Sequence, residues 1–242
     1  PIYLAEALHA AGRREESTSM REEVVRLRDL SNGPGHPHTQ DARTKLMDSY
    51  LESGRYDEAI ELLHENGRRV GVQSTELLNI AIREAWFSPR EGFQALAERI
   101  LSQVDQVTEV AVMERVSRVL TLRPTTNQAM LNVAVDLAHR VATSDTNGPS
   151  ARYGRFAVGI AELRRGRPSA AEPFLTQVAS DSGPGSTLSN AAGFYRAMAL
   201  WAMGQEVEAR KAYAAARTNM RPWPSDPRQP LVGALPTKQL LP

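Results

Sequence analysis

The chain has 242 residues, with 29 Lys and Arg against 28 Asp and Glu, and it contains no Cys. The missing cysteine excludes a disulfide scaffold, Cys-ligated zinc and a cysteine nucleophile, and a net charge of +1 gives no strong field for nucleic acid. The longest apolar run, Ala197 to Met203, is far shorter than the roughly 20 residues that cross a bilayer. We therefore expect a folded cytoplasmic protein that binds no nucleic acid and inserts into no membrane.

Helical periodicity dominates from the first residues onward. The chain opens at Pro1 inside an apolar-periodic run, which suggests a fragment of something longer. Apolar residues recur at three- and four-residue steps, most clearly over 107–120 and 130–142, and so form helical stripes. Clean apolar/polar alternation beside a hairpin turn is missing, so we expect no strands. The sequence predicts roughly twelve helices in six antiparallel pairs.

Turn and capping signals separate these helices along the chain. In the Gly/Pro-rich link at 32–37 and just after it, a rigid turn with Thr39 capping the next helix is expected. Ser88-Pro89-Arg90-Glu91 predicts a capping box with proline at the first helical position, and Thr125-Thr126-Asn127-Gln128 predicts a second box. Further loops are expected at 145–149 and 181–185. The tail, 222–242, holds six prolines and is expected to be extended, either packed along the last helices or leading onward.

One pattern recurs within the pairs: a helix ends in Gly, and the next helix carries Ala about five positions later. Gly is expected to take the positive-φ position that stops the first helix, and Ala to allow a close crossing of the two helices. The three clean copies place Gly54 before Ala59, Gly166 before Ala171, and Gly204 before Ala209.

This pattern resembles the tetratricopeptide repeat, a helix–turn–helix unit that stacks into a right-handed α-solenoid. The first two copies are longer, since Gly12 and Gly54 lie 42 residues apart with a Gly-Pro-Gly-His-Pro-His-Thr link between them, and so resemble the kinesin light chain type. The first copy departs from the family in having Ser17 where Ala is preferred. The resemblance implies repeats of the 42-residue type over 1–71, degenerate helical repeats over 72–149, two tetratricopeptide repeats over 150–221, and the Pro-rich tail over 222–242.

The order of these segments is similar to the region after the kinase domain in planctomycete-type bacterial serine/threonine kinases. The motifs that carry this likeness include Arg90-Glu91-Gly92-Phe93, the stretch from Arg155 to Arg167, and Leu200-Trp201-Ala202-Met203-Gly204. The resemblance implies the regulatory repeat region of a larger signalling protein. The kinase motifs themselves, a Gly-rich loop, His-Arg-Asp and Asp-Phe-Gly, do not occur in this chain.

Site chemistry is sparse. His36 and His38 form a His-x-His pair in the link, but no third ligand stands near them, so we expect no metal and no cofactor. Adjacent carboxylates such as Glu15-Glu16 point about 100° apart on a helix and are interpreted as solvated faces. Arginine clusters at 13–14, 68–69 and 164–167 are interpreted as complements to helix ends. With no nucleophile elbow and no phosphate loop, we expect no enzyme.

The most informative candidates are aromatic residues and a methionine near the glycines of the last two pairs. In a tetratricopeptide superhelix the first helix of each pair lines a groove, where such side chains anchor peptides; burial between repeats is the competing interpretation. The candidate groove residues are Tyr153, Phe156, Phe194, Tyr195, Met198 and Trp201. The sequence thus predicts a non-catalytic module whose partner is a protein or peptide, the kinase domain in cis being one candidate. The alternatives are a self-associating structural repeat and, less favoured, an enzyme built on a helical array.

Overall fold

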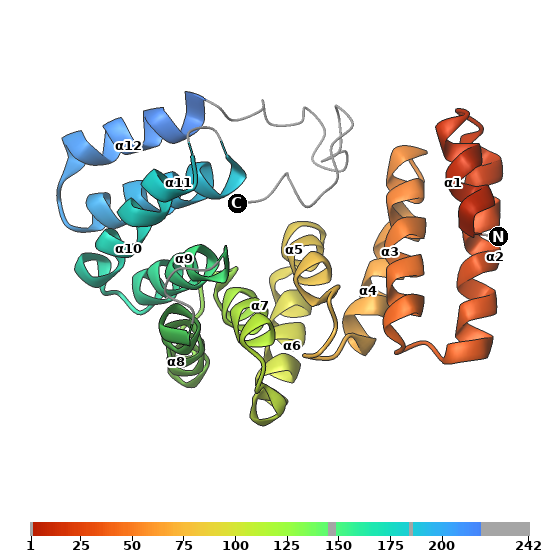
Figure 1. Cartoon of the computed structure of the whole chain (residues 1–242), viewed down its shortest axis with the longest axis horizontal. Coiled ribbons are helices and arrows are strands. Elements are labelled where there is room, and N and C mark those ends of the chain that lie inside the picture. Colours follow the sequence, from red (N-terminus) through yellow and green to blue (C-terminus); the bar gives the residue numbers. More distant parts are fainter. Residues whose placement is uncertain (1, 145–148, 184–185, 219–242) are drawn as a thin grey trace. The chain divides into compact units, whose positions relative to one another are not determined.

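A computed structural model describes residues 2–144, 149–183 and 186–218, and within these ranges every regular element is a helix (Figure 1). The expected tail, 222–242, and the loop at 145–148 lie outside the described residues. The elements are α1 (Ile2–Ala10), α2 (Arg14–Asn32), α3 (Pro37–Glu52), α4 (Tyr56–Arg69), α5 (Leu77–Phe87), α6 (Arg90–Leu101), the 3-10 helix η1 (Val104–Gln106), α7 (Val110–Thr121), α8 (Gln128–Ser144), α9 (Pro149–Arg164), α10 (Pro168–Asp181), α11 (Thr187–Ala202) and α12 (Glu206–Thr218). The prediction of an all-α solenoid built from helix pairs is confirmed.

The described residues divide into two compact units, one up to residue 96 and one from 97 to 218, with the division inside α6. In the first unit α1 packs on α2, α2 on α3, α3 on α4 and α4 on α5. In the second unit α7 to α12 pack each on the next, and α9 also contacts α7 and α11. The predicted boundaries near 71 and 149 concern the type of repeat, a property that this division by compactness does not test.

Four pairs share the same tight turn, centred on a glycine. These glycines are Gly12, Gly54, Gly166 and Gly204, and their φ angles are 75° or 76°. In each turn the amide after the glycine donates to the carbonyl five residues earlier, as from Gln205 to Leu200 over 2.9 Å. This Schellman geometry satisfies carbonyls at the helix end and needs a residue at positive φ. The structure therefore confirms the predicted role of glycine in ending the first helix of these four pairs.

The small residue five positions after each glycine is buried. Ala59, Ala171 and Ala209 are at most 3% exposed. Ser17, the departure from the family pattern, is 1% exposed, and its hydroxyl donates to the carbonyl of Ala5 over 2.7 Å. Serine therefore fits the crossing of α1 and α2, because its one extra polar group is satisfied across the pair.

Helix starts differ from the predictions in three places. Thr39 does not cap α3; the helix begins at Pro37, and the side chain of His36 accepts from the amide of His38. The second box is shifted by two residues, because Asn127, not Thr125, accepts from the amide of Met130 over 3.0 Å, directly before α8. Proline favours an extended conformation in the residue before it and φ near −65° in itself, which suits His36 and Pro37. Before α6, the helix begins at Arg90, one residue after the predicted proline start.

Within the described residues, no helix combines the length and the apolar composition needed to cross a membrane.

Candidate functional site

The six predicted groove residues lie on α9 and α11, and the structure divides them by burial. Tyr153, Met198 and Trp201 have exposed fractions of 42%, 48% and 55%. Phe194 and Tyr195 are partly buried. Phe156 is only 1% exposed and belongs to a core cluster with Leu175 and residues of α11.

Phe156 is therefore not available to a partner. The sequence grouped it with Tyr153 as a candidate groove residue, but residues of α11 pack against this part of α9 and bury the ring. Tyr195 of α11 meets Phe156 edge-to-face, with 5.8 Å between the ring centroids. The core interpretation thus holds for Phe156.

Guanidinium groups alternate with the aromatic rings on the face formed by α7, α9 and α11. The guanidinium carbon of Arg118, on α7, lies 5.7 Å from the ring centroid of Tyr153 and 5.9 Å from that of Phe156. The guanidinium carbon of Arg164, at the end of α9, lies 5.8 Å from the ring centroid of Tyr195. Such cation–π distances are attractive, by about 0.5–1 kcal/mol each at exposed sites. We call the set Arg118, Tyr153, Arg164 and Tyr195 the aromatic–arginine row.

Both arginines of the row are held in place by polar contacts. Arg118 donates to Glu114, one turn earlier on α7, over 2.8 Å. Arg164 donates to the carbonyl of Thr121 over 3.2 Å and to that of Leu122 over 3.4 Å, at the C-terminal end of α7. Arg164 thus complements the C-terminal end of α7, in a neighbouring pair, whereas the sequence predicted such a role at the end of its own helix.

A second group of apolar side chains, three of them exposed and Phe194 partly buried, lies on the last pair, α11 and α12. The rings of Phe194 and Tyr213 meet edge-to-face at 5.6 Å. The guanidinium of Arg210 lies 5.9 Å from the ring of Trp201. Met198 is exposed on the same helix as Trp201. We call Phe194, Met198, Trp201 and Tyr213 the terminal face.

In the first unit, a polar cluster joins α4, α5 and the start of α6, and no sequence motif indicated it. Nδ1 of His64 lies 3.3 Å from the carboxylate of Glu84 and 3.4 Å from the hydroxyl of Ser88, which also donates to Glu84. A catalytic triad needs the carboxylate and the serine on different ring nitrogens of the histidine. Here both face Nδ1, so the arrangement is not that of a triad.

Another polar group of this unit surrounds Tyr50 of α3. Its hydroxyl donates to Glu22 over 2.9 Å, and the guanidinium of Arg55 lies 4.2 Å from its ring centroid. Burial and the bond to Glu22 raise the pKa of Tyr50 to about 12, so the phenol stays protonated at neutral pH. Arg55 also donates to Glu22 and Glu58, and the bond from Arg55 lowers the pKa of Glu58. These contacts fasten the Gly54 turn to α2.

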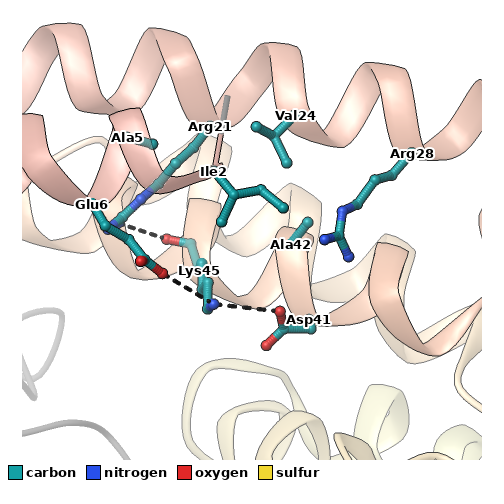
Figure 2. Close-up of a pocket in the computed structure, with 9 residues that line it drawn as sticks. All are labelled: Ile2, Ala5, Glu6, Arg21, Val24, Arg28, Asp41, Ala42 and Lys45. Carbon is teal, nitrogen blue, oxygen red and sulfur yellow. Dashed lines mark hydrogen bonds and ion pairs between the residues drawn. The ribbon is translucent and has the colours of Figure 1, made fainter.

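Figure 2 shows a pocket between α1, α2 and α3. Lys45 lies 3.5 Å from Glu6 and 3.5 Å from Asp41, and Arg21 donates to the carbonyl of Lys45 over 3.1 Å. The pocket has a volume of about 20 Å³, which suits about one water molecule. Lys45 is paired with both carboxylates of the lining, Glu6 and Asp41, and the volume leaves no space for a metabolite.

Across the described ranges, no three His, Asp or Glu side chains gather as ligands for a metal ion. His36 and His38 stand near each other, with ring centroids 5.2 Å apart, but they form no larger group there.

No family model and no curated protein matches the chain. Solved structures similar to it include nearly identical TPR-like repeats of the kinesin light chain type from Podosopora anserina, with 18% sequence identity and a TM-score of 0.38, covering 90% of this chain and 92% of that one. A point variant of the same repeats gives 20% identity, the same coverage and the same TM-score.

Proposed function

We propose that this chain is a non-catalytic protein-interaction module, and that it is the regulatory repeat region of a larger bacterial serine/threonine kinase. The single observation that carries the first part is the aromatic–arginine row, in which the half-exposed ring of Tyr153 lies beside the guanidinium of Arg118, and the ring of Tyr195 beside that of Arg164, on stacked repeats. Solenoids use such continuous faces to bind other proteins. The second part rests on the order of sequence motifs.

The chemistry of the row favours a peptide that carries both a carboxylate and an apolar side chain. A guanidinium has five N–H donors, and the bonds described above use one donor of Arg118 and two of Arg164. Exposed Tyr153 offers a rigid apolar surface beside Arg118. Acidic groups of a partner peptide would bind the arginines, and the tyrosines would pack against its apolar side chains.

Selection from a random peptide library displayed on phage tests the interaction role. We expect enriched peptides to carry Asp or Glu beside an apolar residue, and Tyr153→Ser with Arg118→Gln to weaken their binding at least tenfold. Tyr3→Ser is the matched control, because Tyr3 is 86% exposed on α1 of the other unit. Failure to enrich any peptide, or equal loss of binding in the control, would contradict the proposal.

The kinase context has a separate test in the full-length reading frame. A protein kinase domain encoded upstream of Pro1, with binding between that domain and this chain, supports the regulatory role. An upstream frame without a kinase domain contradicts this part and leaves the peptide-binding role to be judged on its own.

Self-association is the second candidate function, and the exposure of Leu4 favours it. Leu4 is 51% exposed, whereas Leu46, which lies 42 residues later at the equivalent repeat position, is 4% exposed. An uncovered stacking position on α1 suits contact with a second copy. Light scattering that shows a monomer at every concentration would exclude this function.

A further inference from the structure

The terminal face holds large apolar side chains at positions that are buried in the preceding helix pair. Residues 38 positions apart correspond in the last two pairs, because their turn glycines have this separation. Under this offset Ile160 corresponds to Met198, and Leu175 to Tyr213. Ile160 and Leu175 are 5% and 0% exposed in a core cluster that includes residues of α11. Met198 and Tyr213 are 48% and 49% exposed, so the terminal face has the composition of a helix contact without its burial.

Side chains on one side of α11 and α12 form two adjoining stripes, each with steps of four and three residues. On α11 the stripe consists of Phe194, Met198 and Trp201. On α12 it consists of Glu206, Arg210, Tyr213 and Arg217. The ring of Phe194 meets the ring of Tyr213, and the guanidinium of Arg210 lies over the ring of Trp201. The two stripes therefore form one continuous surface.

The stripe on α12 carries opposite charges at its two ends. Glu206 lies in the first turn and Arg217 in the last turn, and both are exposed. When such a helix packs antiparallel against its own copy, position 206 faces position 217, and position 210 faces position 213. Glu206 then lies opposite Arg217 of the second copy, and Arg210 lies opposite the ring of Tyr213 of the second copy. The two-fold symmetry forms each contact twice, giving two ion pairs and two cation–π contacts.

This self-complementarity favours a second copy over an unrelated peptide as the occupant. An identical helix already carries acidic, aromatic and basic groups at the required steps, whereas a peptide would have to match each of them independently. The parallel arrangement would place Glu206 beside Glu206 and Arg217 beside Arg217, and like charges in contact oppose association. The antiparallel arrangement is therefore the one that the charges select.

The size of the surface predicts a reversible dimer. The 13 residues of α12 span about 20 Å, and two packed helices are about 20 Å wide, so the face covers about 400 Å² in projection. Stable complexes bury about 800 Å² on each partner. We therefore expect a dissociation constant in the micromolar range, about 1–100 µM.

We propose that the terminal face binds a second copy of this chain, with the two α12 helices antiparallel, to form a symmetric dimer. The apolar stripe of α11 lies beside α12 and adds apolar area to the contact. The inference rests neither on the aromatic–arginine row nor on Leu4, the residue that favours self-association above. Its failure is therefore distinct from the failure of either proposed function.

Sedimentation of the full chain from about 1 to about 500 µM tests the dimer, and charge reversal tests its register. Glu206→Arg places two arginines opposite each other at both ends of the contact, and Arg217→Glu places two carboxylates there. We expect each variant alone to raise the dissociation constant at least about tenfold, because like charges then meet.

Mixing the two variants separates a lost contact from a folding defect. In the mixed dimer, opposite charges face each other again at both ends, so we expect its dissociation constant to return to within about threefold of the wild-type value. One variant carries a fluorescent label, so that the mixed dimer is distinguished from either variant alone. A misfolded variant would gain nothing from mixing.

Glu208→Arg is the matched control, because Glu208 is also exposed in the first turn of α12 but points about 200° away from Glu206. The formal charge changes by the same amount, and the dissociation constant should stay within about twofold of the wild-type value. A monomer at every concentration would overturn the proposal, and so would mixing that fails to restore association. A dimer that Leu4→Ser dissociates while both charge reversals leave it intact would also overturn it, since the contact would then lie on α1.

Discussion

The two units pack their helices by different means. The first unit buries charged side chains between helices: Arg43 and Arg83 are 3% and 2% exposed. Arg43 of α3 binds Asp29 of α2 over 2.7 Å and Glu65 of α4 over 3.1 Å, and Arg83 of α5 binds Asp48 of α3 over 2.6 Å. Arginines in this unit thus connect one helix pair to the next.

The second unit relies on close backbone approach. A Cβ added to Gly154 would lie 2.8 Å from Val141, and one added to Gly193 would lie 2.9 Å from Ala216. Its core clusters consist largely of alanine with a few large apolar residues. One solenoid therefore uses two solutions: long side chains that bridge helices through ion pairs, and small residues that let helices touch.

Formal charge follows the same division. Residues 1–96 carry 12 Lys and Arg against 16 Asp and Glu, and residues 97–218 carry 14 against 11. The near-neutral total hides an acidic unit and a basic one. Anionic partners are therefore expected to prefer the second unit, which also carries the aromatic–arginine row.

The largest expected effect tests the buried arginines. Replacing Asp29→Asn together with Glu65→Gln removes both carboxylates that contact Arg43, whose side chain is 4% exposed. An unpaired buried charge costs about 3–5 kcal/mol, so urea denaturation should show a loss of that size. Glu16→Gln is the control, because its partner Arg13 is exposed, and it should leave the midpoint almost unchanged. Equal behaviour of both variants would contradict the stabilising role that we assign to the buried arginine of the first unit.

A smaller effect tests the close approach in the second unit. In Gly159→Ala the new Cβ would lie 2.6 Å from Leu175, which is fully buried. Overpacking of this kind costs about 1–3 kcal/mol, which exceeds the gain of up to about 1 kcal/mol from helix propensity. Gly92→Ala on α6 meets only Ser88 at 3.3 Å and should be close to neutral. Thermal denaturation of both variants gives the comparison, and a stabilised Gly159→Ala would contradict it.

The smallest effect is a pH dependence with opposite sign in the two units. Burial raises the pKa of Asp48 in the first unit. In the second, burial alone would raise the pKa of Glu172, but bonds from Thr176 and Arg196 outweigh it and lower the pKa below 4.5. Glu172 therefore stabilises the fold above pH 4.5, and this contribution disappears as the pH falls through the lowered value.

The corresponding measurement is the difference in melting temperature between wild type and Glu172→Gln from pH 6 to pH 3. We expect the wild type to have the higher melting temperature at pH 6, and we expect this difference to decrease below pH 4.5. The raised pKa of Asp48 has the opposite consequence, because the contribution of this group to stability increases as the pH falls. A difference for Glu172→Gln that stays constant over this range would contradict the assignment.

The helical class, the pairing and the four glycine turns could be predicted from the sequence. These are local properties: the apolar period sets the helices, and a positive φ needs glycine at Gly54 or Gly204 whatever surrounds it. The start of α8 was missed by two residues, because Thr125 and Asn127 are both good caps, and only the hydrogen bond to Met130 distinguishes them.

Burial of the periodic apolar residues, in contrast, was settled by tertiary packing. Phe156 and Met198 are both large apolar residues on the first helix of a pair. Phe156 is nevertheless 1% exposed and Met198 48% exposed, because α11 covers Phe156 and no described helix covers Met198. The sequence also could not predict the partners of Arg43. The same is true of the contacts of Arg164 with carbonyls 42 and 43 residues away. Local periodicity determines which side of a helix is apolar, but burial and ion pairing depend on which helix packs against that side.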